Sequence, residues 1–527
     1  MALATIRSMP IKPLPTTKPD PAAAGGPAGL PINLLIDPPT NLSANLPTDL
    51  PTRLLAHLQA LAHGLLERET AARLLLLAAL AGEHVLLIGP PGTAKSELAR
   101  RLHRVFDGAR YFERLLTRFS TPEELFGPLS LKALEDDRYE RLIDGYLPTA
   151  GVAFLDEVFK ANSAILNALL TLLNEREFDN GTARLRTPLI SVIGASNEAP
   201  TDESLLAFHD RFLLRVPVAP VSDGAFADLL ALTDSPAPDL PAPLTAADRA
   251  ALLAARAGVA LGGETPRAMA ALRVVAAGLG LTVSDRRWRQ LVALMRCAAA
   301  SEGRDTLDVL DLWLAPYVLS HDGQTVPALA GWVTTELAQA LAQPLTWLDH
   351  AVTAFEKQLD LEQLLPAAEG DSLDNSAGKL ALARAIGLGE RADDSAAGGI
   401  DSSAPGGDGG LQRLRARPLE DRLRRRFSPV HIAARSAQVA ALRQQADGAQ
   451  ASVQQAHDRL AQRLAHRLWL PPALAQAWLG AHRQTLATLA GLQARLAATR
   501  AGFAALPVDV QLPAVTPAPV TLAPVPG

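Results

Sequence analysis

Short apolar runs alternate with amphipathic segments through the first half of the chain. Residues 84–89, 152–156 and 189–196 are apolar runs that end at Gly, Asp and Ser, respectively. The segments between them carry apolar residues at helical spacing, beginning with one or two helices from Thr52. Buried strands separated by helices are typical of a parallel sheet with helices on both faces. We therefore predict an α/β subdomain over residues 51–235.

The pattern turns wholly helical beyond this region. Residues 236–365 predict an α-helical second subdomain, and residues 433–505 predict an antiparallel helical hairpin that turns at a Pro-Pro pair. Trp469 and Trp478 flank that turn. We interpret them as apolar anchors of the hairpin, with peptide binding as the alternative.

Three segments lack apolar periodicity. Residues 1–50 and 506–527 are rich in proline, so the first is expected to be disordered and the second a loose tail. Residues 366–432 are rich in Gly, Ser, Asp and Arg and predict a linker or a reduced insertion. The arginines between 413 and 426 indicate a solvated linker or helix face, with binding to nucleic acid or an acidic partner as the alternative.

Composition narrows the class of protein. The chain has 527 residues, a net charge of −5 and a single cysteine, Cys297, which excludes a disulfide framework and a cysteine-based zinc site. The longest apolar stretch, residues 71–89, is interrupted by Arg, Gly, Glu and His, and the N-terminus has no apolar signal region. We expect no membrane span and a cytoplasmic protein, and the acidic balance argues against coating of nucleic acid.

The strongest chemical signal is a Gly- and Pro-rich loop between the first predicted strand and a helix. Its residues are Gly89, Pro90, Pro91, Gly92, Thr93, Ala94, Lys95 and Ser96. Backbone N–H groups of such a loop wrap a β-phosphate, Lys95 would neutralise β/γ oxygens, and Ser96 would ligate Mg²⁺. Ala94 stands where Gly is usual, and we expect it in the first helical turn. An ordinary strand-to-helix turn is the alternative.

Polar residues follow the other two predicted strands. Asp156 would hold Mg²⁺, and Glu157 can polarise a water for attack on a γ-phosphate. Asn197 could contact the γ-phosphate or orient that water. Arg211 could stabilise charge on the phosphoryl group, with a surface salt bridge to Asp210 as the alternative. As alternatives, the Asp156–Glu157 pair could cap a helix, and Asn197 could lie in an ordinary turn.

The order GPPGTAKS, FLDE, SNE and DRF resembles that of AAA+ ATPases of the MoxR branch, nearest to the RavA type. The likeness runs from about Leu54 to Leu319 and includes residues 117–147, which resemble the helix-2 insertion. The resemblance implies Walker A at Lys95 and Ser96, Walker B at Asp156 and Glu157, and sensor 1 at Asn197. It also implies that Arg211 is the arginine finger, with Arg215 as the alternative, and that sensor 2 is Arg286, with Arg287 as the alternative.

The resemblance further implies ATP and Mg²⁺ as ligands, a homo-hexameric ring, and a partner protein with a von Willebrand factor A (vWA) domain. Hydrolysis would drive chaperone-like remodelling or maturation of a client protein that the sequence does not identify. RavA-type proteins carry a β-rich domain that binds a lysine decarboxylase. Residues 366–432 lack strand alternation, so the resemblance does not carry that partnership to this chain.

Two other functions fit parts of the sequence. A nucleotide-dependent scaffold would bind ATP without turnover, and Glu157, Asn197 and Arg211 argue against it. A nucleic-acid-dependent motor would use the same fold, and the net charge and the lack of a recognisable DNA-binding module argue against that function.

Overall fold

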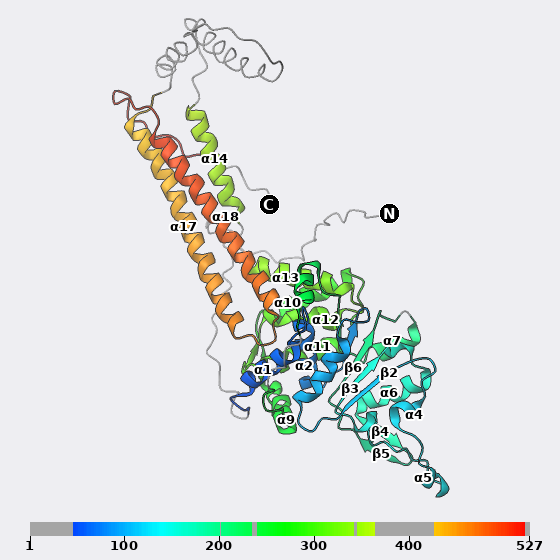
Figure 1. The fold of residues 1–527 in the computed structure, drawn as a ribbon. Helices are drawn as coiled ribbons and strands as arrows, with labels where there is room; N and C mark the ends of the chain where they lie inside the picture. Colours follow the sequence, from blue (N-terminus) through cyan, green and yellow to red (C-terminus); the bar gives the residue numbers. More distant parts are fainter. Residues whose placement is uncertain (1–45, 201, 234–239, 342–344, 364–425, 522–527) are drawn as a thin grey trace, which may run out of the picture. The chain divides into compact units, whose positions relative to one another are not determined.

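A computed structural model describes residues 46–200, 202–233, 240–341, 345–363 and 426–521 (Figure 1). The predicted disorder of residues 1–50 and the predicted linker over 366–432 therefore lie almost wholly outside the described residues, as do the arginines from 413 to 425.

The core of the first half is a five-stranded parallel sheet in the order β2-β3-β6-β1-β7. Its strands are β1 (Val85–Ile88), β2 (Tyr111–Leu115), β3 (Val152–Asp156), β6 (Ser191–Ser196) and β7 (Leu214–Pro217). The three predicted strands are confirmed as β1, β3 and β6, which occupy the buried centre. The two outer strands were not predicted, because their short sequences mix charged and apolar residues.

Helices cover both faces of this sheet. Alternate residues of β1 pack into different apolar clusters, Val85 and Leu87 with α2 and Leu86 and Ile88 with α6, as the two-residue period of a strand requires. The helices of this region are α1 (Leu50–Ala62), α2 (Glu69–Ala81), α3 (Lys95–Leu102), α4 (Pro122–Phe126), α5 (Leu131–Glu135), α6 (Ser163–Glu175), α7 (Glu203–His209) and α8 (Phe226–Ala231). The predicted α/β architecture is confirmed.

Shorter elements complete this half. Strands β4 (Glu177–Asn180) and β5 (Ala183–Arg186) form an antiparallel hairpin apart from the main sheet. Single turns of 3₁₀ helix span His103–Val105, Leu147–Thr149, Val158–Lys160 and Asp223–Ala225.

The next region is mostly helical. It contains α9 (Ala246–Ala255), α10 (Thr265–Gly278), α11 (Asp285–Ser301), α12 (Ala315–Leu319) and α13 (Thr325–Leu341), with 3₁₀ turns at Arg256–Gly258 and Val309–Leu314. The expectation of a wholly helical region is wrong in one detail, because β8 (Ala260–Leu261) pairs in parallel with β9 (Thr306–Leu307). Two residues per strand are too few to leave an alternating pattern in the sequence.

Two long helices, α17 (Pro429–Ala465) and α18 (Pro472–Ala504), form the C-terminal hairpin (Figure 1). Helix α14 (Thr346–Gln363) shares their apolar core through Leu348 and Phe355 instead of packing with the preceding helices. Trp469 and Trp478 are both buried, which supports the interpretation of these residues as anchors.

The predicted loose tail, described up to residue 521, has no helix or strand but makes several hydrogen bonds to the rest of the chain. Phe427 donates its N–H to Pro507 O, and Asp509 returns an N–H to Phe427 O. The Arg435 guanidinium also donates to Ala518 O at 2.8 Å. Prolines lack an N–H donor but keep their carbonyl acceptors, so this segment is held partly through its carbonyl oxygens.

Across the described ranges, no helix combines the length and the apolar character that a membrane crossing requires.

Candidate functional site

The Gly- and Pro-rich loop follows β1 and leads directly into α3. Lys95 begins α3 and is nearly buried, and its Nζ donates to Gly89 O at 2.6 Å and to Pro90 O at 2.8 Å. A Cβ on Gly89 would lie 2.0 Å from Val218 O, so only glycine fits where the loop leaves the sheet. The loop is thus folded around its own lysine.

Ala94 differs from the expectation that it occupies the first helical turn. It is the N-cap of α3, with φ of 64° and ψ of 24°, in the left-handed region. An L-residue pays a steric cost there that glycine does not, because its Cβ approaches the following carbonyl oxygen. This cost explains why glycine is the usual residue at this position of the loop.

The loop offers a row of backbone donors. In the part of the chain that the structure describes, the N–H groups of residues 92–96 donate to no backbone carbonyl. They precede or begin α3, where the helix dipole also favours negative charge. Free N–H groups and a lysine ammonium at a helix N-terminus are the donor set that a phosphate group requires.

Asp156, Glu157 and Asn197 meet at the same edge of the sheet. Asp156 ends β3, and its Oδ1 accepts the N–H of Glu157 at 3.0 Å. Glu157 follows in a left-handed conformation, and its Oε1 accepts a hydrogen bond from Nδ2 of Asn197 at 2.9 Å. Lys160 contributes an ion pair to the other oxygen of Glu157 at 3.4 Å. The carboxylate is therefore held from two sides.

These carboxylates lie within electrostatic range of the loop lysine. Burial lowers the pKa of the Lys95 ammonium, and the charges of Asp156 and Glu157 act in the opposite direction. Strand β6 separates β1 from β3, and it delivers Asn197 between the loop and the two acids. Lys95, Asp156, Glu157 and Asn197 are thus brought together, as the carboxyl ends of parallel strands predict.

Arg68 is a part of this site that the sequence did not indicate. Its side chain is buried at the start of α2, where Nε donates to Thr93 O at 3.1 Å and Nη2 donates to Ala219 O at 2.6 Å. One guanidinium therefore ties the phosphate-binding loop to the segment after β7. No spacing rule marks such a residue, since its partners are backbone carbonyls far away in sequence.

Arg211 lies at the opposite edge of the sheet. It precedes β7, which runs parallel to β1 with Leu214 opposite Val85, and Leu213 donates its N–H to His84 O. Four residues of β1, about 13 Å of strand, separate this edge from the loop. The Asp210 carboxylate pairs with Arg287 at 2.6 Å instead of forming the surface pair with Arg211 that the sequence left open.

Arg215, the other finger candidate, is fully buried in β7. Its Nη1 donates to Ser320 O at 2.8 Å and its Nη2 to His209 O at 3.3 Å. Burial lowers its pKa to about 8, and the charge of Arg287 adds to that effect. This guanidinium has no path to another molecule in the described conformation.

The two sensor 2 candidates have different surroundings. Arg287 is only 2% exposed and donates to Val318 O, to Asp210 Oδ1, and to the carbonyls of Phe212 and Leu213 at 2.9 and 3.1 Å. Arg287 therefore clamps α11 to the loop that carries Arg211.

Arg286 is exposed. Burial raises the pKa of the Glu83 carboxyl just before β1, and Arg286 is among the cations that oppose this rise. Arg286 thus lies at the same edge as Arg211, away from its own phosphate-binding loop.

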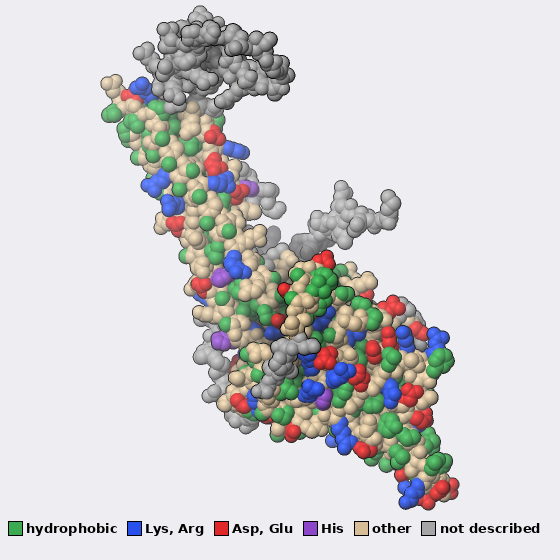
Figure 2. Space-filling view, viewed as in Figure 1, with side chains coloured by type: hydrophobic (Ala, Val, Ile, Leu, Met, Phe, Trp, Pro, Cys, Tyr) green, Lys and Arg blue, Asp and Glu red, His purple; other side chains and the backbone are tan. Residues whose placement is uncertain are grey.

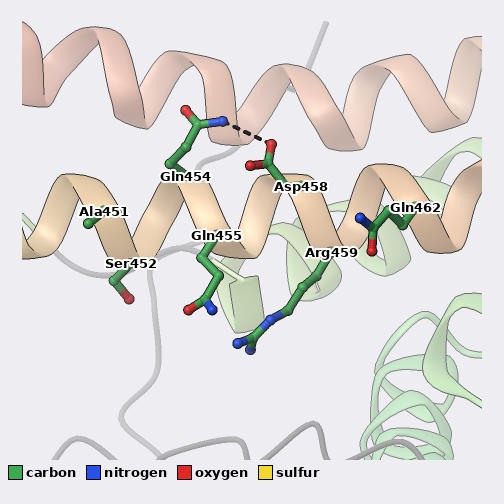
Figure 3. Close-up of a pocket in the computed structure, with 7 residues that line it drawn as sticks. All are labelled: Ala451, Ser452, Gln454, Gln455, Asp458, Arg459 and Gln462. Carbon is green, nitrogen blue, oxygen red and sulfur yellow. Dashed lines mark hydrogen bonds between the residues drawn. The ribbon is translucent and has the colours of Figure 1, made fainter.

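A surface hollow along α17 has no part in this site (Figure 3). Its lining is Ala451, Ser452, Gln454, Gln455, Asp458, Arg459 and Gln462. Gln454 donates to Asp458 at 2.9 Å, and both point toward the neighbouring helix in Figure 3. One helix supplies the whole lining, so the hollow is a groove between side chains on a solvated face.

Comparisons with known proteins match two regions of the chain to family models. Residues 52–235 match the model of the MoxR domain in MoxR–vWA–beta-propeller ternary systems, and residues 272–333 match an AAA lid domain. Both matches fall on the α/β and helical regions described above.

Three curated proteins are similar to parts of this chain. The uncharacterized protein MJ0812 of Methanocaldococcus jannaschii is 42% identical over 248 residues, which cover 47% of this chain and 66% of MJ0812. MJ0079 of the same organism is 56% identical over 151 residues, 28% of this chain and 40% of that protein. Protein MoxR of Paracoccus denitrificans is 33% identical over 153 residues, 28% of this chain and 44% of that protein.

The chain spans less than two thirds of the length of each of these relatives. The matched regions nevertheless contain the loop, the two carboxylates and the lid helices in a single order. Residues 52–235 and 272–333 are therefore the ATPase and lid regions of a MoxR-family AAA+ ATPase.

Proposed function

We propose that this protein hydrolyses ATP with Mg²⁺ in a ring, with each site shared between two subunits, and that hydrolysis remodels a client protein. The observation that carries the proposal is the convergence of Lys95, Glu157 and Asn197 at one sheet edge while Arg211 lies at the other. Nucleotide binding alone would not require a carboxylate oriented by a neighbouring amide.

The residues divide the chemistry between them. The free N–H groups of residues 92–96 and the Lys95 ammonium bind the phosphates. Ser96 and Asp156 would hold Mg²⁺, which supplies charge neutralisation at the phosphate oxygens when it is bound. The Glu157 carboxylate accepts the proton of the attacking water, and the hydrogen bond from Asn197 fixes its orientation.

The position of Arg211 supports catalysis in trans. It cannot reach the phosphates of its own subunit across the length of β1, so it would act on a neighbour. Arg286 lies at the same edge, so as a sensor it too would act on the neighbouring site. A head-to-tail contact that closes makes a ring, and a hexamer is the size that the family suggests.

The partner proposal follows from the family match. The MoxR domain that matches residues 52–235 is named for ternary systems with vWA and beta-propeller components. We infer that this chain works with a vWA-domain protein, with the beta-propeller as a third component. Assignment to the RavA type stays a prediction, which the C-terminal helical hairpin supports.

The test is ATP turnover with Mg²⁺ against protein concentration, together with the mass by light scattering. Turnover per chain should rise as the protein assembles, and Arg211→Ala should abolish turnover without preventing assembly. Arg500→Ala, an exposed arginine on α18, is the matched control and should retain full turnover. Turnover by a monomer that ignores the Arg211 change would overturn the shared site.

The nucleic-acid-dependent motor receives less support. Figure 2 shows basic and acidic side chains interspersed over the face in view, whereas a nucleic-acid track gathers basic residues into a stripe. Salt-sensitive binding of DNA that stimulates turnover would restore this alternative.

A further inference from the structure

Helix α8 is an unusual surface element. Every residue of Phe226–Ala231 is exposed, although most of its side chains are apolar. Phe226 is 52% exposed, Leu230 is 72% exposed, and Leu229 and Leu232 lie beside them. We call these four side chains the α8 ridge. Contiguous apolar surface of this kind marks a place where another molecule binds.

The α8 ridge lies on the same side of the molecule as the phosphate-binding loop. Ser222, four residues before the helix, donates its N–H to Glu67 at 2.9 Å. The next residue, Arg68, bonds to Thr93 O in the loop and to Ala219 O in the segment that leads to α8. The hydrogen bonds at Ala219 and Ser222 therefore hold the start of this segment against the nucleotide site.

A groove that is partly lined by apolar side chains lies between α10 and α11. It has a volume of about 370 Å³, and its lining is Arg273, Ala276, Ala277, Gly280, Leu281, Thr282, Val283 and Trp288. Exposed Val274 and Leu279 adjoin it. We call it the α10–α11 groove. Trp288 follows Arg286 and Arg287 directly, so the groove lies beside the edge of the sheet that carries Arg211.

The ridge and the groove are complementary in charge as well as in polarity. Asp223 and Asp228 are exposed on and beside α8, whereas Arg273 is exposed in the lining of the groove. The two surfaces lie on different sides of one chain, since the ridge adjoins the phosphate-binding loop and the groove adjoins the edge of the sheet that carries Arg211. A projection and a pocket arranged in this way form a head-to-tail contact between copies.

We propose that the α8 ridge of one subunit occupies the α10–α11 groove of the next copy of this chain. The proposal rests on the ring of the proposed function and names the surfaces that form it. Insertion of the ridge would bring the subunit that contributes Arg211 against the phosphate-binding loop of its neighbour. The same contact that covers the apolar helix would thereby complete the nucleotide site.

Cross-linking of two single-cysteine variants tests this contact. The native Cys297 is fully buried, so Leu230→Cys and Ala277→Cys each add one accessible thiol. A short bismaleimide should join the chains into dimers when the two variants are mixed with Mg²⁺ and ATP. Neither variant alone should give dimers. Dimers from Leu230→Cys alone would show ridge against ridge and overturn the proposal.

Assembly gives the second readout. Leu230→Asp should raise the concentration at which rings form by at least about tenfold, while binding of a fluorescent ATP analogue is kept. Leu361→Asp, at a leucine on α14 that is 60% exposed, is the control and should assemble normally.

The outcomes separate this inference from the proposed function. Rings that depend on Arg211 for turnover but assemble unchanged with Leu230→Asp and give no mixed cross-link would overturn the contact alone. Absence of any assembly would overturn both.

Discussion

The two edges of the parallel sheet are built on opposite principles. At the carboxyl edge, Lys95, Glu157 and Asn197 are held by a few hydrogen bonds and leave backbone donors free. At the amino edge, Arg215 and Arg287 are buried and use their donors on backbone carbonyls. Arg286 is exposed at this edge, and Arg211 is partly exposed. The carboxyl edge thus leaves donors free, as the proposed binding of a phosphate requires, whereas the amino edge is held rigidly by buried hydrogen bonds.

Mixing variants of the two edges gives the largest expected effect. Lys95→Ala alone should lose nucleotide binding, and Arg211→Ala alone should lose turnover by about 10³-fold or more. An equal mixture should recover about a quarter of wild-type turnover, because a quarter of random interfaces pair an intact loop with an intact finger. Steady-state phosphate release measures this recovery. A mixture that stays inactive while mixed rings form would show that both groups serve one subunit.

Glu157→Gln tests the carboxyl edge by itself. The amide cannot accept the proton of the attacking water, so turnover should fall by about 10²–10⁴-fold, while ATP affinity stays within a few-fold. Phosphate release and equilibrium binding measure the two quantities. Glu198→Gln, an exposed neighbour of Asn197, is the control. Loss of binding together with turnover would contradict the assignment of Glu157 as the base.

Arg287→Met tests how much the buried hydrogen bonds of the amino edge contribute to stability. It removes a guanidinium that bonds the carboxylate of Asp210 and three backbone carbonyls, so the free energy of unfolding should fall by about 3 kcal/mol. Arg286→Met is the matched control and should change it by less than about 0.5 kcal/mol, because that side chain is exposed. Denaturant titration at fixed nucleotide measures both. Equal destabilisation by the two changes would contradict the conclusion that Arg287 holds α11 against the loop that carries Arg211.

The smallest expected effect is on the stability of the protein at acidic pH. Burial and the charges of Arg215 and Arg287 lower the pKa of His209 to about 3, so it stays neutral in the folded protein at pH 5. The unfolded chain binds a proton there near pH 6.5, so stability falls as the pH drops below that value. His209 should contribute about 2 kcal/mol to the loss between pH 7 and pH 5.

His209→Leu has no ionisable group and should remove that part of the pH dependence. The measurement is the free energy of unfolding at the two pH values. The exposed His466→Leu should leave the difference unchanged. A pH dependence that is the same with and without His209 would contradict the assignment.

The carboxyl edge could be predicted because its residues depend on local sequence. A short apolar strand sets where each polar group emerges, and parallel strands end at one edge, so Lys95, Asp156 and Asn197 converge without further information. The amino edge depends on how α11 packs against the loop before β7, and no periodicity encodes that contact. Arg286 and Arg287 are adjacent in sequence, and only tertiary packing separates the buried clamp from the exposed cation.

Two other differences between the expectations from the sequence and the structure also arise from the tertiary arrangement of the chain. Ala94 adopts a left-handed conformation because the loop must turn before α3, and this outweighs the preference of alanine for helix. Arg68 reaches the loop from a helix that precedes it, through backbone carbonyls that carry no sequence signal.

The turn of the C-terminal hairpin is fixed to the lid by a compact set of ion pairs. Arg467 pairs with Asp311 at 2.7 Å and with Asp308, Arg463 joins Asp308 at 2.9 Å, and the Trp469 indole donates to Ser301 at 2.7 Å. Helix α17 extends for 37 residues from this anchor, about 55 Å. A rotation of the lid by about 10° would therefore sweep the free end of the helix through about 10 Å. The length of the helix would thus amplify a small rotation of the lid into a displacement several times larger than a side-chain contact.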